Sequence, residues 1–130
     1  MKGIQETIDM EPSPQFDAII HVAGGFIPGG LGSGVEHVEK SLSTNLFSAF
    51  TAAELASKYL AESGLLTLTG AQGAFDQGCS FAIGYGMSKA ATHSLAMSIH
   101  SDPSQLPSKS RVVCILPQTI DTAANREAMP

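Results

Sequence analysis

Three short, mainly apolar runs separated by longer stretches constrain the fold of this chain more than any other feature. The runs cover residues 16–22, 64–70 and 111–116, and each ends at or close to glycine or proline. Apolar runs of this length, bounded by turn residues, indicate strands buried within a sheet. Strands that are apolar along most of their length are typical of parallel sheets covered by helices.

The stretches between these runs carry the signals of two long helices. From Val35 onward apolar residues recur at helical spacing, which predicts one helix from about residue 35 to 62, closed by Ser63-Gly64. A second helix is predicted over about residues 82–100, and the segments 23–34 and 71–80 are predicted loops. The alternation therefore predicts an α/β fold with about three parallel strands and two long flanking helices.

Size, charge and cysteine content narrow the class of protein. The chain has 130 residues, and we expect residues 1–130 to form a single domain. Its formal net charge of −5 argues against nucleic acid or an anionic membrane as a partner. No stretch approaches the roughly 20 apolar residues of a membrane span, and residues 1–6 lack the apolar core of a signal peptide. Cys79 and Cys114 stand far apart and are expected to be free thiols in the cytoplasm.

The histidines do not predict a metal site, and no serine hydrolase motif is present. None of the four histidines has the His-Glu-x-x-His spacing of a ligand pair; they are His21, His37, His93 and His100. No Gly-x-Ser-x-Gly sequence occurs either. These residues therefore indicate neither a metal site nor a serine hydrolase.

A tyrosine and a lysine four residues apart, Tyr85 and Lys89, carry the clearest chemical signal. On the second predicted helix they share one face, about a turn apart. A neighbouring ammonium favours the phenolate and lowers a tyrosine pKa from its usual value of about 10. Such a tyrosine can exchange a proton with a substrate at neutral pH. The same spacing also arises where a tyrosine simply packs on a lysine stem.

The loops that follow the strands strengthen this signal. Ligands of open parallel sheets bind at the carboxyl ends of the strands, where Ala23-Gly24-Gly25, the segment from Ala71 and Pro117-Gln118-Thr119 are expected to meet. Asn45 lies on the first predicted helix, forty residues before the tyrosine. Together with Tyr85-x-x-x-Lys89 these segments resemble the catalytic half of the short-chain dehydrogenase/reductase family.

The resemblance implies a Rossmann-like fold and a role for each residue. In that family the tyrosine donates or accepts the proton that accompanies hydride transfer, the lysine tunes it and holds the nicotinamide ribose, and an asparagine supports a proton relay. By resemblance Tyr85, Lys89 and Asn45 are the catalytic residues, and no metal is implied. The implied contacts with NADH or NADPH come from Ala23, Gly24, Gly25, Lys89, Pro117, Thr119 and Thr122.

One departure from the family pattern points to a branch. The usual serine, about 12–14 residues before the tyrosine, would fall within Ala71-Gln72-Gly73 and is missing. Its absence argues against ordinary alcohol or ketone chemistry. The dihydropteridine reductase branch of the family also lacks this serine, and several blocks across residues 16–130 resemble that branch. That branch implies reduction of a quinonoid dihydropterin to a tetrahydropterin with NADH or NADPH, so the implied substrate is a small pterin.

The resemblance also implies what the chain lacks. Family members open with a strand, a glycine-rich turn and a helix that receive the cofactor pyrophosphate, and the residues before Phe16 are too few to supply them. We therefore expect a partial Rossmann-type domain, an open sheet edge at residues 16–22, and weak or absent cofactor binding by this chain alone. A homodimer through the two long helices is expected.

Two other functions stay open from the sequence. One is a short-chain reductase that acts on a small carbonyl compound. The other is a non-enzymatic fragment that serves as a dimerisation partner.

Overall fold

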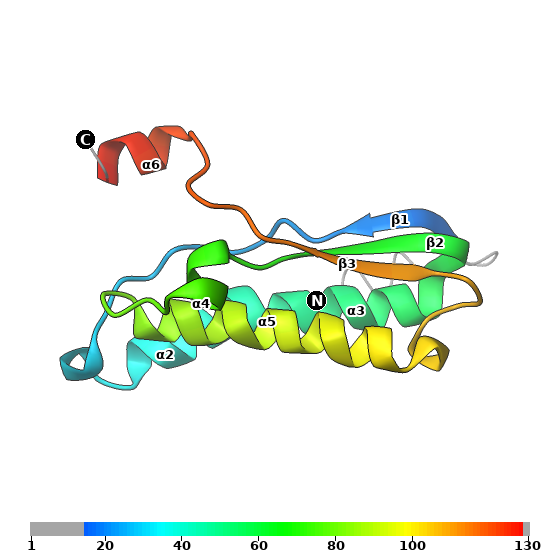
Figure 1. Ribbon diagram of the computed structural model, residues 1–130, viewed down its shortest axis with the longest axis horizontal. Coiled ribbons are helices and arrows are strands. Elements are labelled where there is room, and N and C mark those ends of the chain that lie inside the picture. Colours follow the sequence, from blue (N-terminus) through cyan, green and yellow to red (C-terminus); the bar gives the residue numbers. More distant parts are fainter. Residues whose placement is uncertain (1–14, 129–130) are drawn as a thin grey trace.

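The sheet has three parallel strands in the order β1-β2-β3 (Figure 1). The computed structural model describes residues 15–128, and the strands are β1 (Phe16–Ile20), β2 (Leu60–Thr69) and β3 (Arg111–Ile115). In the register of the sheet, Leu66 of the central strand pairs with Ile19 on one side and Val112 on the other. The predicted Rossmann-like parallel sheet with flanking helices is confirmed for this part of the chain.

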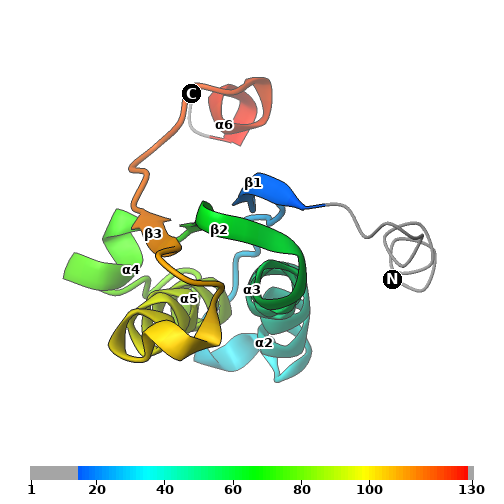
Figure 2. The same ribbon diagram turned by 90° about the vertical axis from the view of Figure 1, so that its right-hand side faces the viewer.

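Two long helical stretches cover one face of the sheet (Figure 1, Figure 2). The first is formed by α2 (Glu36–Ser41), η2 (Leu42–Phe47) and α3 (Ser48–Tyr59), which follow one another without a break. Its middle part, η2, is a π-helix, the wider form in which backbone hydrogen bonds span five residues. The second stretch is α5 (Ile83–Ser101).

The remaining elements are short. They are η1 (Leu31–Ser33), α4 (Gln72–Asp76), η3 (Pro103–Gln105) and α6 (Ala123–Ala128). In both views α6 lies on the side of the sheet opposite to α3 and α5, at the end of an extended segment (Figure 2). No helix within residues 15–128 is long and apolar enough to cross a membrane.

Several predicted boundaries are wrong. The first helix ends at Tyr59 rather than about residue 62, because Leu60 is extended, pairs with Phe16 and is only 3% exposed. Ser63 is therefore not a C-cap residue, and it lies inside β2 with a φ of 64°. The predicted loop 71–80 contains α4, and Pro14, the turn residue that precedes the first apolar run, lies outside the described residues.

Small residues let the helices approach one another and the sheet closely. The buried residues of the core include three alanines of α3, at positions 49, 53 and 56, packed against Leu66 and Leu68 of β2. At Gly84 of α5 a Cβ would lie only 2.8 Å from the Cα of Val38 in α2. The crossing of the two helical stretches at this point therefore depends on a residue without a side chain.

The prediction that the three apolar runs are buried strands is correct for one face of the sheet and wrong for the other. The face of the sheet that packs on α3 and α5 holds Ile19, Leu66, Leu68 and Val112. The opposite face is open, because β1 is exposed at four of its five positions and β3 alternates between exposed and half-buried residues. We call the apolar side chains on that side the open sheet face: Ile20, Leu65, Val113 and Ile115.

Candidate active site

Tyr85 and Lys89 lie one turn apart near the start of α5. The Lys89 Nζ is 5.9 Å from the centroid of the Tyr85 ring. Lys89 is only 5% exposed, and its Nζ donates a hydrogen bond of 2.9 Å to the carbonyl oxygen of Thr69, the last residue of β2. The lysine is therefore a buried cation held at the carboxyl end of the central strand, as the spacing and the predicted topology require.

Asn45 lies in the π-helical segment and binds the loop that follows β1. It is fully buried, its Oδ1 accepts from the Gly25 N–H at 3.0 Å, and its Nδ2 donates to the Gly25 carbonyl at 3.1 Å. The same Nδ2 lies 3.2 Å from the carbonyl of Ser41 on the preceding turn. One side chain thus fixes both backbone groups of Gly25, so the loop and the first helical stretch form one unit.

Gly24 lies beside two of the three predicted catalytic residues, Asn45 and Lys89. Its φ is 156°, and a Cβ added there would lie 2.7 Å from Asn45 Oδ1 and 3.4 Å from Lys89 Nζ. Only glycine fits this close approach. The loop after β1, the π-helix and α5 therefore converge at the carboxyl end of the sheet.

The electrostatics of the pair differ from the sequence expectation. Burial raises the pKa of Tyr85 above 10.0, and a charge on the neighbouring Cys79 would raise it further. Burial also lowers the pKa of Lys89, which a charge on Cys114 partly opposes. The ammonium is directed at the Thr69 carbonyl rather than at the phenol oxygen, so the expected lowering of the tyrosine pKa is wrong here.

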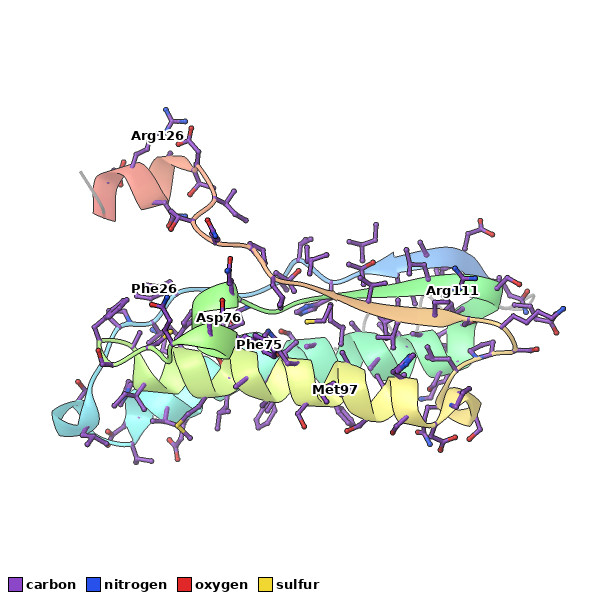
Figure 3. The ribbon with its side chains drawn as sticks, viewed as in Figure 1. Phe26, Phe75, Asp76, Met97, Arg111 and Arg126 are labelled. Carbon is purple, nitrogen blue, oxygen red and sulfur yellow. The ribbon has the colours of Figure 1, made fainter. Side chains whose placement is uncertain are left out.

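An exposed phenylalanine stands beside the tyrosine, and a second exposed phenylalanine packs on the first. The Phe26 ring meets Tyr85 edge-on with the ring centroids 5.1 Å apart, and it also lies 6.1 Å from the ring of Phe81. Phe26 and Phe81 are 53% and 69% exposed. We call these two rings the aromatic shelf; they give the tyrosine an apolar, accessible border (Phe26 is labelled in Figure 3).

The loop after β2, where the family serine is missing, is occupied by a histidine contact. The N–H of Ala71 donates to Nε2 of His93 at 3.3 Å, and the His93 ring packs on Phe75 with centroids 5.5 Å apart. Burial and the charge of Lys89 lower the pKa of His93, so its ring is neutral and able to accept this bond. The N–H of Gln72 donates to the carbonyl of Pro117, which ties the loops after β2 and β3 together.

Not every predicted cofactor residue lies with the others. Gly24, Gly25 and Lys89 are in the group described above, Ala23 is exposed in the same loop, and Pro117 is tied to the neighbouring one. Thr119 and Thr122 follow on the segment that leads from β3 to α6, and α6 itself lies on the other side of the sheet (Figure 1). There the Thr122 hydroxyl accepts from the N–H of Asn125 at the start of α6.

Sequence reasoning missed several residues that build the site. His21, Ser48 and Thr69 form a part-buried hydrogen-bonded set behind Asn45, and Gly84 sets the helix crossing next to Tyr85 in the sequence. A histidine in an otherwise apolar strand was a usable signal for such a set. The sequence carried no such signal for its partners, because Ser48 and Thr69 are distant from His21 in the sequence.

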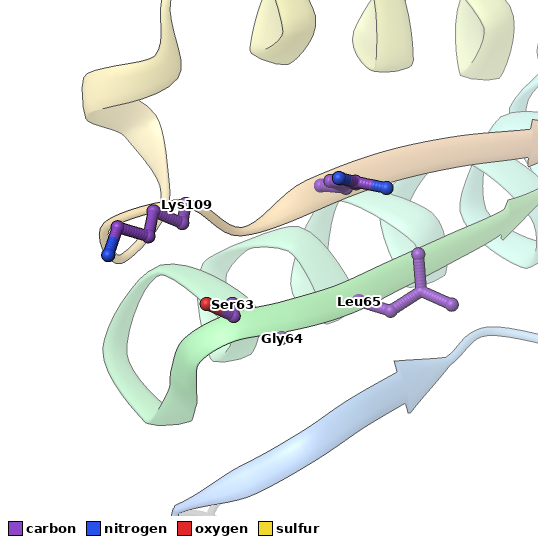
Figure 4. A pocket seen from close by; sticks show the side chains of 5 residues that line it. Ser63, Gly64, Leu65 and Lys109 are labelled. Carbon is purple, nitrogen blue, oxygen red and sulfur yellow. The ribbon is translucent and has the colours of Figure 1, made fainter.

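One hollow of the surface lies away from this chemistry. A pocket of about 480 Å³ is lined by Ser63, Gly64, Leu65, Lys109 and Arg111 (Figure 4). It lies where the strands begin, whereas Tyr85 and Lys89 lie where they end; Figure 3 shows Arg111 and Phe26 at opposite ends of the molecule. The convergence of buried polar groups, and not this hollow, identifies the candidate site.

Comparison with known proteins agrees with this geometry. A sequence profile described as short chain dehydrogenase matches residues 4–130. The chain is 37% identical over 131 residues to a protein of Dictyostelium discoideum named dihydropteridine reductase, covering 99% of this chain and 56% of that protein. The chain thus spans little more than half the length of this relative.

Solved structures share the fold. A short chain dehydrogenase family protein from Francisella tularensis has a TM-score of 0.82 and 23% identity, over 98% of this chain and 52% of that one. The protein BdcA, solved in complex with NADPH, has a TM-score of 0.78 and 18% identity, over 95% of this chain and 50% of that one. With the profile match over almost its full length, the chain belongs to the short-chain dehydrogenase/reductase family.

Proposed function

We propose that this chain is the catalytic half of a Rossmann-type domain that reduces a quinonoid dihydropterin to a tetrahydropterin with NADH or NADPH. The observation that carries the proposal is the convergence of Tyr85, Lys89, Asn45 and Gly24 at the carboxyl end of the sheet. The identity of 37% with a dihydropteridine reductase along 99% of the chain supports the substrate class.

Tyr85 is the proposed proton donor. A phenol whose pKa is raised by burial is protonated at neutral pH, which is the form that a donor needs. When the proton leaves, the ammonium of Lys89, 5.9 Å from the ring centroid, stabilises the negative charge on the phenolate. Asn45 holds the loop at Gly25 and supports the relay that returns the proton.

The residues at this end of the sheet fit a nicotinamide cofactor. The missing side chain of Gly24 lets the loop backbone pass close to Asn45 Oδ1 and Lys89 Nζ. An ammonium has three N–H donors, of which Thr69 takes one, so Lys89 can also bind a ribose hydroxyl. We assign cofactor contacts to Ala23, Gly24, Gly25, Lys89 and Pro117. We also assign them to Thr119 and Thr122, which lie on the segment after β3. The reduced cofactor would supply the hydride.

Two features favour a pterin over a simple ketone. The aromatic shelf of Phe26 and Phe81 offers exposed ring surface next to the donor, which suits a flat heteroaromatic ligand. At the place of the usual serine, the segment Ala71-Gln72-Gly73 brings no hydroxyl to polarise a carbonyl, and the N–H of Ala71 is directed to His93. A short-chain reductase of small carbonyl compounds is the alternative.

The test is the oxidation of NADH or NADPH with quinonoid dihydropterin, compared with a panel of ketones. Tyr85→Phe is expected to lower turnover by roughly 10²–10⁴-fold, the usual contribution of a positioned acid. The matched control is Tyr59→Phe at the far end of α3, with unchanged turnover. Full activity of Tyr85→Phe would refute the donor role, and turnover of ketones alone would favour the alternative.

A homodimer through the two long helices is the second proposal, and exposed apolar residues favour it. On the first helical stretch Phe47 and Phe50 are more than half exposed, as are Met87 and Met97 on α5. Each pair lies on the side of its helix that does not pack on the sheet. If the chain itself shows no reductase activity, this association is the function that remains.

A further inference from the structure

His21 lies behind the candidate site and has no role in the proposed chemistry. It follows β1 and is 6% exposed. Its backbone is fixed to β2 on both sides, since its N–H donates to the Thr67 carbonyl at 2.9 Å and its own carbonyl accepts from the Thr69 hydroxyl at 2.7 Å. The imidazole is therefore anchored to the sheet, at the same residue whose carbonyl binds Lys89.

The side chain of His21 reaches across to the first helical stretch. Its Nε2 lies 2.9 Å from the hydroxyl oxygen of Ser48. That hydroxyl has a single proton, which it donates to the Thr44 carbonyl at 2.7 Å, with a longer contact of 3.2 Å to the Asn45 carbonyl. Ser48 therefore accepts from His21, and the proton of the imidazole is on Nε2.

The other ring nitrogen fits this assignment. Nδ1 of His21 is buried and has no hydrogen-bond partner within the described part of the chain. An N–H left without an acceptor in a buried place is disfavoured, so the neutral ring with its lone pair at Nδ1 is the stable form. Burial and, after it, the charge of Lys89 lower the pKa of His21, which also acts against a second proton on the ring.

This contact is made at the joint between η2 and α3, where Asn45 lies one turn before Ser48. A π-helical turn is rare and is retained only where other contacts favour it. Here the side chains bind the helix carbonyls: Ser48 binds Thr44, and Asn45 binds Ser41. Of these three bonds, two lie within the helical stretch. The His21–Ser48 bond is the one that joins the helical stretch to the residue that follows β1.

We propose that His21, as the Nε2–H tautomer, is a positioning residue that acts through Ser48 to hold the π-helical turn in the register that presents Asn45 to Gly25. The proposal rests on the proposed function for its relevance to catalysis. The positioning itself concerns contacts within this chain and is measurable without turnover.

The first measurement is the tautomer in the unaltered protein, from long-range ¹H–¹⁵N NMR spectra of the histidine rings. We expect a protonated Nε2 and an unprotonated Nδ1 for His21. The opposite tautomer would overturn the proposal, whatever the variants do.

The second measurement is amide hydrogen exchange of Gly25, whose N–H is held by Asn45. In Ser48→Ala the exchange of Gly25 is expected to accelerate at least tenfold relative to that of Leu66 in the central strand. His21→Gln keeps an N–H donor near the Nε2 position and is expected to retain the protection of Gly25. His21→Asn has a shorter side chain and is expected to lose that protection. Equal acceleration at Gly25 and Leu66 would indicate a merely structural role and would contradict positioning, as would unchanged exchange at Gly25.

If these results hold while Tyr85→Phe keeps full pterin activity, only the proposed function fails. If Gly25 is unaffected while Tyr85→Phe is inactive, only the positioning role of His21 fails.

Discussion

Replacing Gly84 with alanine is expected to destabilise this protein, although alanine is the better helix former. A Cβ at Gly84 would lie 2.8 Å from Val38 Cα and 3.2 Å from the His37 carbonyl oxygen. Both are backbone atoms, which cannot rotate away. Carbon atoms in contact prefer separations of about 3.5–4.0 Å, so α5 and α2 must move apart by roughly 0.7 Å or more.

The magnitude follows from two opposing effects. Overpacking of this kind costs about 1–3 kcal/mol, and the higher helix propensity of alanine offsets up to about 1 kcal/mol. The expected result is a loss of about 1–2 kcal/mol in the free energy of unfolding. Urea unfolding followed by far-UV circular dichroism measures it.

Gly73→Ala is the matched control. Gly73 lies in α4, is exposed, and a Cβ there meets no heavy atom within 4 Å. The same gain in helix propensity is therefore expected without the overpacking, which raises stability by up to about 1 kcal/mol. If Gly84→Ala were stabilised as much as Gly73→Ala, the close crossing of α5 and α2 would be refuted. The packing of the start of α5 against the first helical stretch would be refuted as well.

Two further predictions concern pH and association. Burial and Lys89 lower the pKa values of His21 and His93 below 6.5, so at lower pH the unfolded chain binds more protons than the folded one. The contribution of the two neutral rings to the free energy of unfolding should then be fully present above pH 6.5. It should be lost as the pH falls towards the pKa values of the rings in the folded state. Urea titrations across this range should show a shallower fall in the free energy of unfolding for His93→Gln than for the exposed control His100→Gln. A free energy of unfolding that does not change with pH in the unaltered protein would contradict the burial of the two rings. For association, light scattering after size-exclusion chromatography should show a dimer that Phe50→Lys or Met97→Lys converts to monomer. Leu31→Lys, at a position 90% exposed in η1, should leave it intact, and a monomeric unaltered chain would exclude the helix-mediated dimer.

Local patterns in the sequence predicted most of the fold. The three apolar runs and the helical spacing give the strands and the two helical stretches, because these signals depend on neighbours a few residues away. The pairing of Tyr85 with Lys89 is of the same kind. The sequence did not predict the short helix α4 or the end of the first helix at Tyr59. Tertiary contacts, such as that of Leu60 with Phe16, decide these features.

What the sequence could not give depends on burial and on distant partners. The direction of the Tyr85 pKa is set by how deeply the phenol is buried, and spacing alone does not report that. The π-helical register around Asn45 has no pattern in the residues 42–47 that would separate it from an ordinary helix. The bond of His21 to Ser48 joins residues 27 apart in the sequence.

The open sheet face has a consequence for how the folded state is judged in solution. Ile20, Leu65, Val113 and Ile115 present ordered apolar surface to water in the native chain. Hydrophobic dyes that become fluorescent on apolar surface are commonly used as indicators of a molten globule. A well-packed sample of this protein would bind such a dye as well, through a rigid sheet rather than through loosened packing. Near-ultraviolet circular dichroism and dispersed side-chain resonances are therefore the measures that distinguish the two states.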